Sequence, residues 1–186
     1  MIKFIKKLAV IGTLFIIGAS AFASGLDNQN AIGLYVIGAE TSIGGLQYER
    51  RFTDVLSVKF GGFASYQNRD TYNSGEAQFN FVVEPDFTLY EADWGSKVGS
   101  RLFAFGLVGY DYQRICLSRW DTTDPNKRLA DEVKNQYSLV GAAGFGFDFI
   151  FFGHLSVPIQ FGFLGMLNTI DPNVGFCAGV GLRYSW

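Results

Sequence analysis

The sequence is poor in cysteine, histidine and proline. It has two cysteines, Cys116 and Cys177, one histidine, His154, and four prolines in 186 residues. Structural zinc sites need close sets of cysteine and histidine ligands, and no C-x-x-C pair occurs, so no metal or cofactor site is expected. Nothing in the sequence brings the two cysteines together. They are interpreted as two separate small hydrophobic residues, and a disulfide between them is left open.

The chain also lacks an excess of positive charge and, after its first residues, any apolar run long enough for a membrane helix. Its 15 basic and 17 acidic residues give a net charge of −2, so nucleic acid is not expected as a partner. Even so, 48% of the residues are hydrophobic, 17% are aromatic and 23 are glycines. This apolar material must therefore be spread over many short segments.

The first residues have the three-part form of a secretory signal peptide. Three lysines precede an apolar run over residues 8–19, and a small-x-small cleavage site ends at Ala23. An uncleaved anchor is the alternative, but a spanning helix needs about 20 apolar residues. We expect Sec-type export, removal of residues 1–23 and one mature domain over residues 24–186, whose net charge is −5 once the lysines are lost.

The rest of the chain divides into eight stretches rich in aromatic and aliphatic residues and glycine. Short polar or turn-forming runs separate them, and helical periodicity is hard to find. Most stretches exceed the usual strand of about five or six residues and match the roughly 9–11 residues of a tilted strand that crosses a bilayer. The stretches cover residues 31–40, 44–52, 55–67, 78–91, 99–115, 137–151, 155–168 and 174–186.

Several stretches alternate between apolar and polar residues. In residues 78–91 the phenylalanines oppose Glu84 and Asp86, although Val82 and Tyr90 fall on the polar side. A soluble sandwich or lipocalin would have too little interior for so many apolar faces, whereas a barrel in lipid turns them outward. The pattern predicts an all-β fold, an eight-stranded antiparallel transmembrane up-and-down β-barrel.

Two stretches fit this alternation less well. Phe63 falls on the polar side of residues 55–67. Residues 99–115 leave apolar side chains on both faces in either phase, so their inner face is not assigned.

The charged residues of the polar faces are predicted to lie inside the barrel. Eight strands enclose a space just wide enough to be filled by side chains or to hold one small ligand. Because unpaired buried charges are costly, we expect a charge-paired plug that blocks water flow; an acid/base site and a narrow ion path are the alternatives. The predicted network comprises Glu49, Arg51, Lys59, Glu84, Asp86, Asp148 and Arg183.

The connections alternate in length and predict an orientation. If both termini lie in the periplasm, the long connections near residues 68–77 and 116–136 face the outside. Trp120 is then a candidate contact residue for a ligand. The connection over residues 92–99 is long for a periplasmic turn.

The signal peptide, the eight stretches, the segments "YERRFTDVLSVKFGG" and "GFGFDFIFFGHLSVPIQFGF" and the terminal "LRYSW" together resemble the small eight-stranded outer-membrane barrels of the OmpA, OmpW and opacity-protein type. The resemblance covers nearly all of the mature chain. In that family the last strand ends in an aromatic residue, usually Phe, that the outer-membrane assembly machinery recognises. Trp186 stands in that place, with Tyr184 and Leu182 at the alternate positions.

This resemblance implies a location in the outer membrane of a Gram-negative-type cell, in contact with membrane lipid and lipopolysaccharide. It implies a structural or surface-interaction role, with a host or surface ligand bound by the extracellular loops. Trp94, Tyr110, Tyr112 and Trp186 are interpreted as members of interfacial aromatic girdles. A narrow channel or carrier for a small solute, hydrophobic solutes included, is the alternative.

An enzymatic role is not expected. A lipid A deacylase on a similar scaffold uses a His-x-Ser pair with a nearby carboxylate, and His154 and Ser156 have this spacing. However, Val157 replaces that family's Asn, no acid follows until Asp171, and the pair is predicted at a periplasmic turn. A lipid A-modifying activity is therefore the least favoured alternative.

Overall fold

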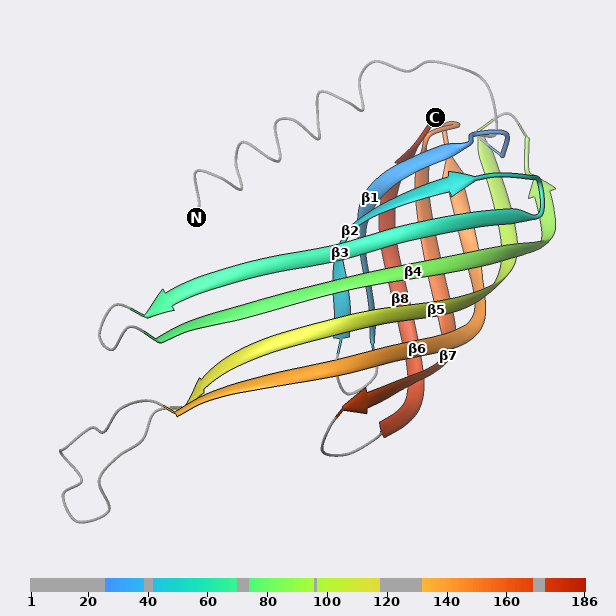
Figure 1. The fold of residues 1–186 in the computed structure, drawn as a ribbon. Helices are drawn as coiled ribbons and strands as arrows, with labels where there is room; N and C mark the ends of the chain where they lie inside the picture. Colours follow the sequence, from blue (N-terminus) through green and yellow to red (C-terminus); the bar gives the residue numbers. More distant parts are fainter. Residues whose placement is uncertain (1–25, 39–41, 70–73, 96, 118–131, 169–172) are drawn as a thin grey trace, which may run out of the picture.

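The chain forms a closed β-barrel (Figure 1). The computed structural model describes residues 26–38, 42–69, 74–95, 97–117, 132–168 and 173–186. The predicted signal peptide and Trp120 lie outside the described residues. Within those ranges, no helix has the length and apolar character needed to cross a membrane.

Eight antiparallel strands make up the barrel. Each pairs with the next along the chain, and β1 also pairs with β8, which closes the ring. The predicted eight-stranded antiparallel up-and-down barrel is therefore confirmed. The strands are β1 (Asn30–Gly38), β2 (Ser42–Arg51), β3 (Leu56–Arg69), β4 (Ser74–Asp93), β5 (Val98–Leu117), β6 (Glu132–Phe151), β7 (Leu155–Asn168) and β8 (Asn173–Ser185).

The three central strands, β4, β5 and β6, are longer than the sequence predicted, at 20 residues each. Because β4 runs to Asp93 and β5 begins at Val98, only residues 94–97 connect them. The connection predicted over residues 92–99 is therefore shorter than expected. The connections at the end of the barrel where β1 begins and β8 ends are short; we call this the terminal end and the opposite one the loop end.

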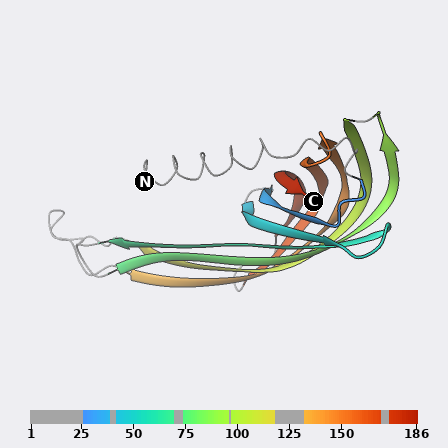
Figure 2. The ribbon, with the colours of Figure 1, turned by 90° about the horizontal axis from the view of Figure 1, so that it is seen from above.

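Strands β3 to β6 project past the others at the loop end (Figure 1). The β3–β4 ladder continues to the pair Arg69–Ser74, and the β5–β6 ladder to Leu117–Glu132, whereas β1 and β2 already end at Gly38 and Ser42. Figure 2 shows the projecting ends from above as a continuation of one wall of the barrel. Their inner face has no opposite wall.

Phe63 remains an exception to the sequence pattern in the structure. The alternation of β3 places Phe63 on the inner face, as predicted, and 44% of the side chain is exposed.

The outer face of the barrel is apolar over all eight strands. Leu34, Phe145, Phe163 and Leu182 are each more than half exposed, as are many other aliphatic and aromatic side chains. Monomeric soluble proteins rarely expose apolar patches larger than a few hundred Å². A water-soluble barrel has a polar outer face, so this continuous apolar surface is the opposite arrangement.

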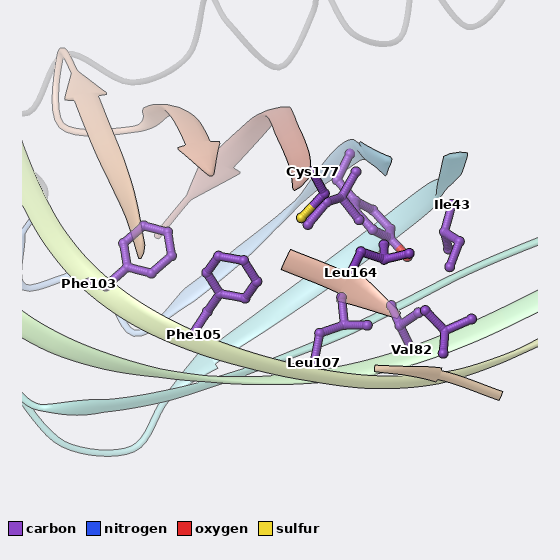
Figure 3. Close-up of a cluster of buried hydrophobic side chains, with 10 residues drawn as sticks. Ile43, Val82, Phe103, Phe105, Leu107, Leu164 and Cys177 are labelled. Carbon is purple, nitrogen blue, oxygen red and sulfur yellow. The ribbon is translucent and has the colours of Figure 1, made fainter. Parts of the chain in front are cut away.

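The inner face of the loop half is apolar as well. Phe103, Phe105 and Leu107 project from β5 toward Leu164 and Cys177 (Figure 3). This settles the unassigned strand: the odd-numbered residues of β5 face inward. The apolar cluster contains Tyr35, Ile37, Ile43, Val82, Phe103, Phe105, Leu107, Val140, Leu164 and Cys177.

The two exceptions in β4 have different causes. Val82 does face inward, where the surrounding layer is apolar, and it is 1% exposed. Tyr90 faces outward, because a register shift between Thr88 and Tyr90 inserts an extra residue and reverses the alternation. Its predicted inward placement is therefore wrong.

Candidate functional site: a charged cluster inside the barrel

The terminal half of the barrel interior holds a cluster of buried charged side chains. They come from β2, β3, β4, β5, β6 and β8, so nearly every strand contributes one or two. Inward alternation at period two places them, because each of them except Lys59 lies on the same face as a member of the apolar cluster further along its strand. The ionic cluster comprises Glu49, Lys59, Glu84, Asp86, Arg101, Asp148 and Arg183, all at most 5% exposed.

Two arginines and two carboxylates form one half of the ionic cluster. The Arg101 guanidinium donates from Nη2 to Glu49 Oε1 at 2.8 Å and to Asp148 Oδ2 at 3.2 Å. Arg183 donates from Nη2 to Asp148 Oδ2 at 2.6 Å and from Nη1 to Glu49 Oε2. Each carboxylate thus contacts both arginines, and the four strands that carry them are tied across the lumen.

A lysine between two carboxylates forms the other half. Lys59 Nζ lies 2.6 Å from Glu84 Oε1 and 2.6 Å from Asp86 Oδ2. The Gln160 amide from β7 also donates to Glu84 Oε1. The ammonium group sits 4.4 Å from the centroid of the Phe103 ring, which separates the ionic cluster from the apolar cluster.

Arg51 does not belong to the ionic cluster. It lies half-buried at the terminal mouth, where its guanidinium pairs with Glu91 Oε1 at 2.5 Å and donates to the backbone carbonyls of Leu26 and Asp54. The structure therefore brings together six of the seven predicted interior residues and places the seventh at the rim.

Arg101 is the cluster member that sequence reasoning missed. The apolar residues around it on β5 obscured the alternation. Its charge was itself the available signal, because an arginine amid an apolar strand that crosses lipid is far more stable facing the lumen.

His154 and Ser156 have separate partners. The Ser156 hydroxyl donates to Asp148 Oδ1 at 2.5 Å and accepts a hydrogen bond from Arg183. His154 lies in the turn between β6 and β7, with its Nδ1 2.8 Å from the Ser185 carbonyl oxygen and its ring stacked on Tyr184. Within the described residues no hydrogen bond joins the imidazole to the Ser156 hydroxyl.

The ionic cluster adjoins a small cavity. A cavity of about 20 Å³ adjoins Glu49, Arg101 and Asp148 at the terminal mouth, enough for about one water molecule. In the described part of the chain, no group of three or more His, Cys, Asp or Glu side chains is arranged to hold a metal ion. Chemically, the site is a set of paired charges packed against each other.

The remaining residues singled out from the sequence are those at the end of β8 and the two cysteines. Leu182 and Trp186 are about half exposed on the outer face, and Tyr184 stacks between His154 and Trp186. Cys116 and Cys177 are both buried free thiols, so no disulfide joins them.

Aromatic side chains gather near both ends of the outer face. At the loop end, Tyr137 lies between Tyr110 and Tyr112, with ring centroids 6.5 and 5.2 Å away. At the terminal end, Trp94 is 73% exposed and Trp186 is 47% exposed. Their role in interfacial girdles stays a prediction.

Comparisons with known proteins return barrels of the same kind. No family model matches the sequence, and no curated protein sequence matches it. In structure, the chain is similar to the N-terminal β-barrel domain of Pseudomonas aeruginosa OprF, with 12% identity, 86% of this chain and 98% of that chain covered, and a TM-score of 0.49. It is also similar to Ail, the attachment invasion locus protein of Yersinia pestis, with 12% identity, 86% and 97% coverage and a TM-score of 0.41.

A second structure of Ail, in complex with the heparin analogue sucrose octasulfate, is similar at 13% identity, with the same coverage and a TM-score of 0.41. These proteins are eight-stranded outer-membrane barrels, the type that the sequence resembles. At such identities the likeness concerns the fold alone.

Proposed function

We propose that this chain is an integral outer-membrane protein of a Gram-negative-type cell, with a sealed barrel and a structural or surface-interaction role carried by its loop end. One observation carries the proposal: the barrel exposes an apolar outer face and encloses paired charges. This arrangement suits lipid outside and a polar lumen inside.

The free energy of exposing the apolar outer face favours lipid over water as its surroundings. Each Å² of apolar surface left in water costs about 25 cal/mol, so more than thirty large exposed apolar side chains would be a heavy penalty for a soluble protein. In lipid the same surface is favourable. Closure of β1 on β8 supports the proposal, because an open edge in lipid would leave backbone groups without hydrogen-bond partners.

The filled lumen argues against the alternative of a narrow channel or carrier. The ionic cluster occupies the terminal half and the apolar cluster the loop half. A solute would have to displace both layers, and the first is held by ion pairs from six strands.

The partners follow from this location. The outer face contacts membrane lipid and lipopolysaccharide, and Leu182, Tyr184 and Trp186 serve as the signal for the assembly machinery. The predicted loops near residues 68–77 and 116–136, of which residues 70–73 and 118–131 connect the strands, meet host or surface ligands after export and removal of residues 1–23; Trp120 is the candidate contact residue.

Cysteine labelling in intact cells tests the location and orientation. In a Cys116→Ser/Cys177→Ala background, a single cysteine replaces either Lys134, exposed at the loop end, or Asp93, exposed at the terminal end. A membrane-impermeant maleimide is expected to label Lys134→Cys in intact cells and Asp93→Cys only after the outer membrane is permeabilised. Equal labelling of both in intact cells, or recovery of the protein in the soluble periplasmic fraction, would contradict the proposal.

A further inference from the structure

The projecting ends of β3, β4 and β5 carry a hollow on their inner face that belongs to neither interior cluster. It has a volume of about 310 Å³, at the lower end of the range for small-ligand sites. We call it the amide groove. Its lining includes Ser65, Gln67, Glu76, Gln78, Gln113 and Ile115.

We propose that the amide groove binds uncharged sugar units of a glycan. The inference rests on the proposed function, because the groove meets such a ligand only if the loop end faces the outside.

The two faces of the projecting ends differ in chemistry. The outer face carries Tyr66, Phe79, Tyr112 and Tyr137, whereas the inner face carries mainly amides and a hydroxyl. Because no opposite wall covers the inner face, its polar groups are accessible along the hollow. The groove is therefore a polar surface within an otherwise aromatic region.

A buried carboxylate orients two of the amides. Gln113 Nε2 donates to Asp111 Oδ2 at 2.9 Å, and the Gln78 side chain also hydrogen-bonds to Asp111, which is 6% exposed. With its nitrogen held in this way, the Gln113 amide leaves Oε1 available as an acceptor. Ser65 and Gln67 form no side-chain hydrogen bond within the described part of the chain, so they keep both donor and acceptor capacity.

A buried acceptor next to the groove on β4 is also unsatisfied. Asn80 lies two residues from Gln78 on the same face of β4, is 2% exposed, and its Oδ1 has no hydrogen-bond partner in the described structure. Nearly all buried polar atoms in proteins have a partner. A ligand hydroxyl, directly or through one water, would supply it.

Sugar units fit this set of groups better than other ligands. Amide and hydroxyl side chains both donate and accept, as sugar hydroxyls do. The lining includes one acidic residue, Glu76, and one basic residue, Arg114, and the carboxyl group of Asp111 is buried nearby, so the groove offers no net positive charge to sulfate or phosphate groups. Phe63, exposed on the same face of β3, and Ile115 offer apolar surface to the C–H face of a sugar ring.

The test uses the full mature chain folded in detergent micelles and an array that carries neutral and sulfated oligosaccharides of bacterial and animal origin. The wild type is expected to retain neutral oligosaccharides, and the origin of those retained distinguishes a glycan of the same membrane from one of a host. In titrations with the best-retained neutral oligosaccharide, Gln78→Ala combined with Gln113→Ala is expected to weaken binding by about tenfold or more, because each loses at least one hydrogen bond.

Asn135→Ala is the matched control. Asn135 is an amide on the outer face of β6, bonded to the Tyr112 hydroxyl, and its loss is expected to leave binding unchanged. Retention of sulfated oligosaccharides alone, no retention at all, or unchanged affinity in the double variant would overturn the inference.

Each variant is first run on a detergent gel with and without boiling. A protein that shifts on boiling but binds no neutral oligosaccharide contradicts only the amide groove, whereas a protein that shows no shift contradicts the proposed function.

Discussion

Arg183 shows how a single residue stabilises this barrel. Its side chain is fully buried and pairs with Glu49 and Asp148, which also bind Arg101. Removal of one member of a buried pair is costly because it leaves the remaining charges without compensation.

We therefore expect Arg183→Met to lower the free energy of unfolding by about 3 kcal/mol. Urea titration of the protein in lipid vesicles measures the change. Arg50→Ala is the control, because Arg50 is half-buried on the outer side of the same barrel end and loses one hydrogen bond to Asn30, worth about 1 kcal/mol. Equal effects of the two substitutions would show that the ionic cluster does not stabilise the fold.

Glycine size matters at one contact between β6 and β7. A Cβ added to Gly144 would lie 2.1 Å from the Phe161 carbonyl oxygen, whereas one added to Gly106 on β5 would meet nothing within 4 Å. Gly144→Ala is expected to cost about 1–3 kcal/mol through overpacking, and Gly106→Ala less than about 1 kcal/mol. The same urea titration compares them, and a stable Gly144→Ala variant would contradict the close approach of the two strands.

At the scale of strands, alternation was a good guide wherever the two faces met different surroundings. It identified all eight strands and the inner face of most of them, because lipid outside and ion pairs inside demand opposite residue types. It failed for β5, where Phe103, Phe105 and Leu107 face an apolar lumen and so resemble the outer residues. Arg101 was missed for that reason.

Two other departures lie beyond the reach of periodicity. The bulge at Thr88 and Tyr90 changes the phase in mid-strand, and no local residue signals it. The exposure of Phe63 on an inner face is not signalled by the alternation of β3 itself. The amide groove could not be predicted from periodicity either, because it exists only where β3 to β6 extend beyond the other strands.

The position of an outward-facing residue along its strand determines whether the residue lies in lipid or in water. Phe145 and Val133 both face outward on β6, Phe145 beside β7 in the barrel wall and Val133 on the projecting end. Phe145→Arg is expected to cost about 2–4 kcal/mol in vesicles, whereas Val133→Arg is expected to cost less than about 1 kcal/mol. Equal tolerance at the two sites, measured by urea titration, would mean that the wall at Phe145 does not lie in lipid.

At the scale of the whole molecule, two clusters of side chains are stacked inside the barrel. Our proposal is that the ionic cluster closes the terminal half by charge pairing and the apolar cluster closes the loop half by packing.

Planar bilayer recordings with the purified wild-type protein are accordingly expected to show no steady conductance. A large, steady single-channel current would contradict the sealed lumen and favour the channel alternative.

The measurement that tests the account most directly is a detergent gel of the outer-membrane fraction, unboiled beside boiled. A closed barrel with an apolar outer face is expected in that fraction. Its mobility is expected to change on boiling, because the hydrogen-bonded barrel stays folded in detergent until it is heated. A protein that appears in the soluble periplasmic fraction and shows no shift would contradict the account, since its apolar faces would then have to point inward.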